Sequence, residues 1–113
     1  MSANKQRCSF RLKCPPWNFI VSVSWGERGW LSYRRSVLQS GGHDVGMEPD
    51  EDNKGECWGT SVWVLEFDDA ILVHELHHVA TRAMEFVSVD DEECEAYLQS
   101  WLYGKVMKRW GRM

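Results

Sequence analysis

The stretch from Ile71 to Arg82 constrains the fold of this chain more than any other part of it. It reads I-L-V-H-E-L-H-H-V-A-T-R, in which His74, Glu75 and His78 form the pattern H-E-x-x-H. Residues four apart lie on the same face of a helix, so these two imidazoles can share one cation. Both flanks of that face are apolar, with Leu72, Leu76, Val79 and Ala83 on one side and Val73, Ala80 and Met84 on the other. We therefore expect a helix that lies deep in the domain and has a polar window at its histidines.

Composition limits the protein to one domain and disfavours two classes of partner. The 113 residues are 43% hydrophobic and include seven tryptophans, enough apolar mass for a core without disulfide bonds. The net charge of −4 argues against nucleic acid as a partner. No apolar run approaches the ~20 residues that a membrane span needs, and no apolar segment follows the polar start. We expect a single domain over residues 1–113, in the cytoplasm, with reduced thiols.

The periodicity of apolar residues predicts an α+β domain with the element order β-β-α-β-α-α. Residues 1–6 are expected to be a loose terminus, and the acidic, glycine-containing segment 43–56 is expected to be a surface loop. Alternation predicts strands, and spacings of three and four predict helices. The expected strands are 8–12, 17–25 and 58–67, and the expected helices are 30–38, 69–85 with an N-cap at Asp68 or Asp69, and 88–108 with a capping-box-like start.

A catalytic zinc site usually has three protein ligands, and the last predicted helix offers carboxylates for the third. Its expected core face comprises Cys94, Tyr97, Leu98, Trp101 and Leu102, and a stripe of small residues at Ala96, Ser100 and Gly104 would let another helix approach. Glu93 lies beside both features on a helical wheel, whereas Glu95 points to the far side. We therefore select Glu93 as the third ligand and keep Glu95 as the alternative. Asp90, Asp91 and Glu92 are assigned to stabilising the start of the helix.

With these residues in view, the chain resembles the gluzincin type of zinc metallopeptidase. The segment Ile71 to Val106 is similar to small metallopeptidases of bacteriophages and prophages, in which an E-x-x-A-Y-L pattern follows H-E-x-x-H. Here that pattern is Glu93–Leu98, and only fourteen residues lie between His78 and Glu93. The resemblance implies a minimal zincin: a small sheet packed on the H-E-x-x-H helix, followed by a helix that carries the third ligand. A phage-encoded protein of this kind would act in the cytoplasm of the host cell.

The resemblance also implies a zinc-dependent hydrolysis of peptide bonds in a peptide or protein substrate. One Zn²⁺ per chain would be held by His74, His78 and Glu93, and Glu75 would take a proton from the water at the fourth position. The strand predicted at 58–67 would pair with an extended substrate beside the site. Four residues are candidates for stabilising the transition state, and the sequence does not rank them: His43, Tyr97, Tyr103 and Arg82.

Two other interpretations remain open at this level. The chain can be a zinc-binding regulatory or virion-associated protein that retains the site and turns over weakly, or it can use zinc only for stability. His77 lies about a third of a turn from the metal face, so it is interpreted as a surface or hydrogen-bonded histidine. The sequence contains no feature that identifies the substrate or the oligomeric state.

Overall fold

The protein is a small α+β domain, here described from a computed structural model that covers residues 8–14, 18–66, 68–86 and 91–110. This confirms the expected class. The described residues contain four strands and three helices, in this order: β1 (Ser9–Cys14), β2 (Phe19–Trp25), α1 (Gly26–Gln39), β3 (Gly55–Trp58), β4 (Ser61–Val64), α2 (Asp69–Phe86) and α3 (Glu92–Trp110).

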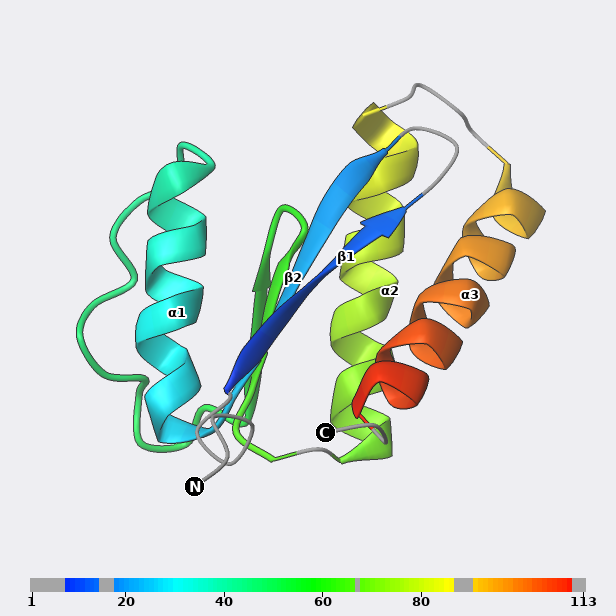
Figure 1. Cartoon of the computed structure of the whole chain (residues 1–113). Coiled ribbons are helices and arrows are strands. Elements are labelled where there is room, and N and C mark those ends of the chain that lie inside the picture. The colour runs from blue at the N-terminus through cyan, green and yellow to red at the C-terminus, as the bar shows by residue number, and fades with distance from the viewer. Residues whose placement is uncertain (1–7, 15–17, 67, 87–90, 111–113) are drawn as a thin grey trace.

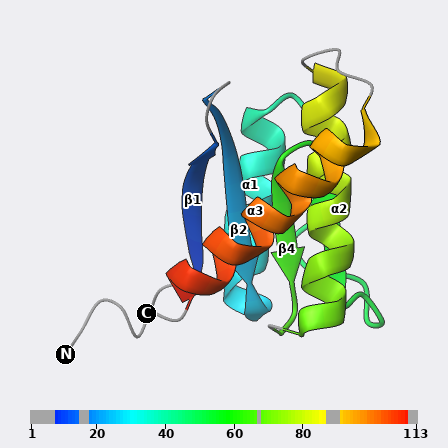
Figure 2. The same cartoon turned by 90° about the vertical axis from the view of Figure 1, so that its right-hand side faces the viewer.

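The strands form one mixed sheet in the order β1-β2-β4-β3. β1 pairs antiparallel with β2, β2 pairs parallel with β4, and β3 pairs antiparallel with β4. Helix α1 covers one face of this sheet, and α2 and α3 cover the other (Figure 1). In the view turned by 90°, α3 crosses in front of the strands and beside α2 (Figure 2). The result is three layers, with the sheet in the middle.

The larger core lies between the sheet and the pair α2 and α3. Alternate strand residues point to this side, including Val21, Val23, Val62 and Val64, which are fully buried. α2 contributes six core side chains from one broad stripe, and α3 contributes three at helical spacing: Leu72, Leu76, Val79, Ala80, Ala83, Met84, Leu98, Leu102 and Val106. The apolar stripe of α2 is therefore the feature that fixes this helix against the sheet.

The smaller core lies on the other face and is built around tryptophan. Trp30, Tyr33 and Val37 of α1 pack on Trp63 of β4, and the indole rings of Trp30 and Trp63 meet edge to face at 4.9 Å. β2 presents serines to this side, and these small residues let α1 approach closely. A Cβ added at Gly29 would lie 3.3 Å from the backbone carbon of Ser24. A bulkier residue at position 29 would therefore push the first turn of α1 away from the sheet.

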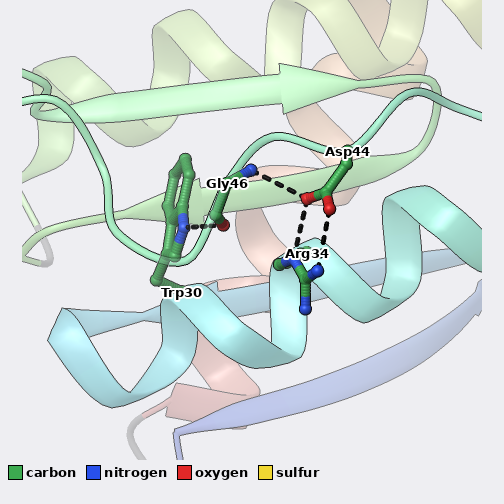
Figure 3. A network of polar contacts seen from close by, with 4 residues as sticks. All are labelled: Trp30, Arg34, Asp44 and Gly46. Carbon is green, nitrogen blue, oxygen red and sulfur yellow. Dashed lines mark hydrogen bonds and ion pairs between the residues drawn. The ribbon is translucent and has the colours of Figure 1, made fainter.

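Polar contacts attach the segment that follows α1 to the helix itself (Figure 3). The guanidinium of Arg34 donates two hydrogen bonds to the carboxylate of Asp44, at 2.7 and 2.8 Å. The indole N–H of Trp30 donates to the carbonyl of Gly46 at 2.9 Å, and the Gly46 amide donates to Asp44. Asp44 and Gly46 of the loop are thus both bonded to side chains of α1, and these bonds hold this part of the loop against the helix.

The strand predicted at 58–67 is present, but it is shorter than predicted, because β4 covers only Ser61–Val64. The structure has a hairpin there, in which β3 ends at Trp58, Gly59 turns the chain with a φ of 58°, and β4 begins at Ser61. β4 is an inner strand of the sheet, so it cannot pair with a substrate. The predicted loop 43–56 is also too long at its end, since its last two residues already belong to β3. The glycine at a left-handed φ is the physical reason for both differences.

The helix boundaries agree better with prediction, because local caps set two of them. The Asp68 carboxylate accepts from the amides of Ala70 and Ile71, and Asp91 accepts from two amides of the first turn of α3. α1 begins at Gly26, four residues before the expected start. Among the described residues, no helix is both long and apolar enough to cross a membrane.

The predicted core face of α3 needs correction at two positions. Leu98 and Leu102 are buried as expected, but Cys94 is exposed and Tyr97 is 76% exposed. The buried line continues to Val106 instead. α3 is therefore rotated relative to the predicted wheel, and the small residues Ala96, Ser100 and Gly104 face solvent rather than α2.

Candidate metal centre

His74 and His78 meet on the exposed side of α2, one turn apart. Their Nε2 atoms are 3.2 Å apart, and the two rings stand edge to face with centroids 4.8 Å apart. Both side chains are exposed, while the opposite side of the helix is buried in the core. The H-E-x-x-H pattern thus produces the convergence of imidazoles that the sequence predicts.

The distance between the two nitrogens suits a shared metal ion. Two nitrogens bound to one tetrahedral zinc at about 2.0–2.1 Å are about 3.3 Å apart. The pKa of His78 is lowered by partial burial and by the neighbouring charges of His74, His77 and Arg82. A neutral imidazole is the form that binds a metal. The arrangement therefore provides two ligands of the kind and spacing that zinc requires.

Glu75 lies between the histidines in sequence but on a different side of the helix. Its side chain is 7% exposed and points towards β3. Burial raises the pKa of its carboxyl, His74 lowers it, and Glu56 raises it. A carboxylate whose proton affinity is increased in this way is suited to general base catalysis.

Gly55 of β3 makes the close approach of the strand to Glu75 possible. A Cβ at position 55 would lie 2.7 Å from the Cγ2 of Ile71 and 3.1 Å from a carboxylate oxygen of Glu75. Real Cβ atoms do not come as close as 2.7 Å to a neighbour, so any residue but glycine at this position would force Ile71 or the backbone of α2 or β3 to shift. The sequence around Gly55 has no strand pattern that would single out this residue. Its position in a strand beside the H-E-x-x-H helix could not be recognised until β3 was known.

Beside these residues lies an open hollow of about 340 Å³. One wall of the hollow is formed by α2, through Ala70, Ile71, His74 and Glu75. The other wall is formed by the chain that enters β3, through Asp52, Asn53, Lys54 and Gly55. β3 is the last strand on this side of the described sheet. Its first residue, Gly55, lines the hollow, and no described strand pairs with its outer edge.

Hydrogen bonds fix the start of β3 in this place. Tyr33 of α1 donates its hydroxyl to Glu56 at 3.0 Å, and the side-chain amide (Nδ2) of Asn53 donates to the other oxygen of Glu56 at 2.9 Å. The Asn53 side chain also accepts from the amide of Gly55 at 3.1 Å. Because both oxygens of Glu56 are bound, this edge strand is held on its α1 side while its other side faces α2.

The two candidates for a third ligand lie on α3, and the structure does not bring either to the histidines. Glu93 is exposed on the outer side of α3, and Glu95 is half-buried. α3 contacts α2 on the flank of Val73, whose carbonyl accepts from Gln99 at 3.2 Å. On a helix, His74 and His78 lie about 100° and 140° around from Val73. Within the described residues, no group of three or more His, Cys, Asp or Glu side chains is arranged to hold a metal.

Three other predicted site residues lie on α3 or in the loop after α1. His43 is exposed in the loop after α1, beside the Asp44 that pairs with Arg34, and so belongs to the opposite face of the sheet. Tyr97 is exposed on the outside of α3. Tyr103 donates its hydroxyl to Asp69 at 3.0 Å.

His77 and Arg82 are nearer to the pair. The His77 ring is 6.0 Å from that of His78, and His77 is exposed, in keeping with its interpretation as a surface histidine. Arg82 is one turn after His78 and pairs with Glu85 at 3.3 Å. Partial burial raises the pKa of the half-buried Cys57 thiol to about 12, and the charge of Arg82 acts against this rise. Of the four candidates for transition-state stabilisation, Arg82 is therefore the one carried by α2 itself.

Comparison of the chain with models of protein families, with curated proteins and with solved structures gave no match.

Proposed function

We propose that the protein is a zinc-dependent metallopeptidase whose site lies at the junction of α2 and β3. The observation that carries this proposal is the 3.2 Å distance between the Nε2 atoms of His74 and His78, next to a buried Glu75. These residues fit a zinc ion as two of its ligands and a general base. A zincin-like organisation follows from the proposal, with the sheet on one side of the H-E-x-x-H helix and α3 as its following helix.

Zinc bound by the two imidazoles would supply a Lewis acid and would lower the pKa of a coordinated water towards neutrality. Glu75 is placed to accept a proton, because burial raises its proton affinity and its carboxylate lines the same hollow as His74. After bond cleavage the same carboxyl would return the proton to the leaving amine. Both roles need a carboxyl group at position 75, and a glutamine would provide neither.

The substrate class follows from β3 rather than from β4. An extended peptide can add to the free edge of a sheet through backbone hydrogen bonds. β3 is the edge strand beside α2, and Gly55 gives its backbone a close position to Glu75 without an intervening side chain. An unfolded or extended segment of a peptide or protein is therefore the substrate that this hollow fits.

Metal content provides the first test. Plasma mass spectrometry of the untagged protein should find zinc, and His78→Ala should abolish binding, because one imidazole alone gives a weak site. His77→Ala is the matched control, since it removes an exposed histidine next to His78 on the same helix and should keep the metal. Wild-type protein that contains no zinc after purification with added zinc would contradict the proposal. Glu93→Ala and Glu95→Ala, measured beside these, decide whether α3 supplies a ligand.

Cleavage of a peptide library provides the second test. Glu75→Gln should bind zinc as the wild type does and should lose cleavage, by about a hundredfold or more for the loss of a general base. This result would distinguish the peptidase from a second candidate, a zinc-binding regulatory or virion-associated protein. The second candidate is favoured by one observation, namely that the described residues contain no three-ligand group. For that candidate the substitution would change neither the metal content nor any cleavage.

A further inference from the structure

The outer face of α3, defined here as Glu93, Tyr97, Ser100, Gly104 and Lys108, forms a continuous line along the helix. These residues follow one another at spacings of four, three, four and four, so they lie on one side. All five are exposed. In Figure 2 this helix lies towards the viewer, with the sheet and α2 behind it.

An aromatic side chain and open space lie next to each other on this face. Tyr97 is 76% exposed, which is unusual for a large side chain on a helix that packs on a core. A shallow hollow of about 220 Å³ lies beside it, lined by Glu93, Ala96, Tyr97 and Ser100. One turn after Ser100, a Cβ at Gly104 would meet nothing within 4 Å. The face thus offers both a protruding ring and a place where a ring of another molecule can lie against backbone.

The charges at the two ends of α3 are opposite in sign. Its first turn contains Glu92, Glu93 and Glu95, and its last turn contains Lys108 and Arg109. A helix that lies antiparallel on this face with the same charge order would bring acid against base at both ends. The helix dipoles would also be opposed, which is the favourable orientation. A second copy of α3 has this charge order.

We propose that two copies of this protein associate through the outer faces of their α3 helices, antiparallel and related by a two-fold axis that passes between Ser100 and Trp101. Glu93 and Lys108 are equally far in sequence from that point, and so are Tyr97 and Gly104. The symmetry therefore pairs Glu93 of each copy with Lys108 of the other, and seats each Tyr97 ring over the other copy's Gly104. Each contact occurs twice, as in any interface with two-fold symmetry.

The expected interface is small. From Glu93 to Lys108 the helix is about 22 Å long, and one helix face of that length lies well below the about 800 Å² per partner of a standard interface. We therefore expect a weak dimer whose mass depends on protein concentration rather than an obligate one. The two ion pairs set its orientation, and the Tyr97–Gly104 contacts supply most of its apolar burial.

Sedimentation velocity over about a hundredfold range of protein concentration tests this pairing. The wild type should approach twice the monomer mass at the highest concentrations. Glu93→Lys and Lys108→Glu should each weaken association by about tenfold, because each creates two like-charge contacts per dimer. The double variant should restore the wild-type behaviour. Wild-type protein that remains a monomer throughout, or single variants that associate as the wild type does, would overturn the proposal.

Two controls separate this interface from other effects. Arg35→Glu reverses an exposed charge on α1, across the sheet from α3, and should leave association unchanged. Tyr97→Ala should weaken association without altering the charges. The measurements are repeated with a metal chelator, because Glu93 belongs to this interface and is also the third zinc ligand expected from the sequence. Association that persists with chelator would establish the dimer even if the zinc site proves absent.

Discussion

Gly55→Ala tests the close packing of β3 on α2 most directly. The added Cβ would lie 2.7 Å from the Cγ2 of Ile71, about 1 Å closer than the optimum between carbon atoms. It would also lie 3.1 and 3.3 Å from the Oε2 and Cγ of Glu75. Isoleucine is branched at Cβ and has few rotamers, so it cannot move aside cheaply. The strand and the helix must then separate, or Glu75 must change its position.

We expect Gly55→Ala to lower the free energy of unfolding by about 1–2 kcal/mol. Overpacking costs about 1–3 kcal/mol. The loss of glycine's freedom in the unfolded chain offsets about 0.4–1 kcal/mol of that cost. For a domain of this size the net change corresponds to a decrease in Tm of about 4–15 °C. Urea unfolding followed by tryptophan fluorescence, beside thermal unfolding, measures both quantities.

Gly104→Ala is the matched control, because it adds the same methyl group in open space on a helix. This variant should gain about 0.5–1 kcal/mol, since alanine is a better helix former than glycine. The two variants should therefore differ in sign. If Gly55→Ala were as stable as the wild type or more stable, the close contact between β3 and α2 would be refuted, and with it the position proposed for Glu75.

Three further predictions concern other parts of the molecule. Ser24→Ala should be neutral or stabilise by about 1 kcal/mol in urea unfolding, because the buried Ser24 hydroxyl has no hydrogen-bond partner among the described residues. Asp44→Asn should reduce stability at neutral pH. Its bonds to Arg34 and to a backbone amide hold the pKa of the Asp44 carboxyl below its usual range. A carboxyl group with a lowered folded pKa stabilises the fold fully above its unfolded pKa of about 3.9, and this stabilisation is lost as the pH falls from there towards the folded pKa. The difference in unfolding free energy between Asp44→Asn and the wild type should therefore vanish in strong acid. The exposed Cys94 should react with a thiol reagent in the native protein long before the half-buried Cys57, whose pKa is raised to about 12, and equal rates for the two would contradict the structure.

Local chemistry explains which parts of the fold were predictable from the sequence. Asp68 caps α2 as expected because its carboxylate bonds amides two and three residues ahead, which needs no tertiary contact. The stripe of α2 was predictable in the same way, from the spacing of its apolar residues. Val73 is the exception, since it is 39% exposed next to the flank that α3 covers. A helical wheel assigns Val73 to the apolar side of α2, but it does not show how much of that side the neighbouring helix covers.

The parts that were missed depend on contacts far apart in sequence. β3 has the sequence Gly-Glu-Cys-Trp, which lacks the alternation of a strand, and its Glu56 is held by Tyr33 of α1. The rotation of α3 is set by how Leu98, Leu102 and Val106 fit the sheet, so the exposure of Tyr97 could not be derived from the helix alone. For the same reason Glu93 was chosen from its wheel position, whereas its distance from His74 depends on the docking of α3 against α2.

The parallel pairing of β2 with β4 has a consequence for how the chain folds. The partners Ser22 and Ser61 are 39 positions apart in sequence, and the whole of α1 and its loop lie between them. Closing so long a segment costs chain entropy, and this cost is offset only once the contacts between β2 and β4 have formed. We therefore expect the centre of the sheet to form late. During synthesis β2 emerges well before β4, with the uncharged sequence Phe-Ile-Val-Ser-Val-Ser-Trp. Until β4 arrives, only β1 can cover one of its edges, and the nascent chain is most exposed to aggregation in that interval.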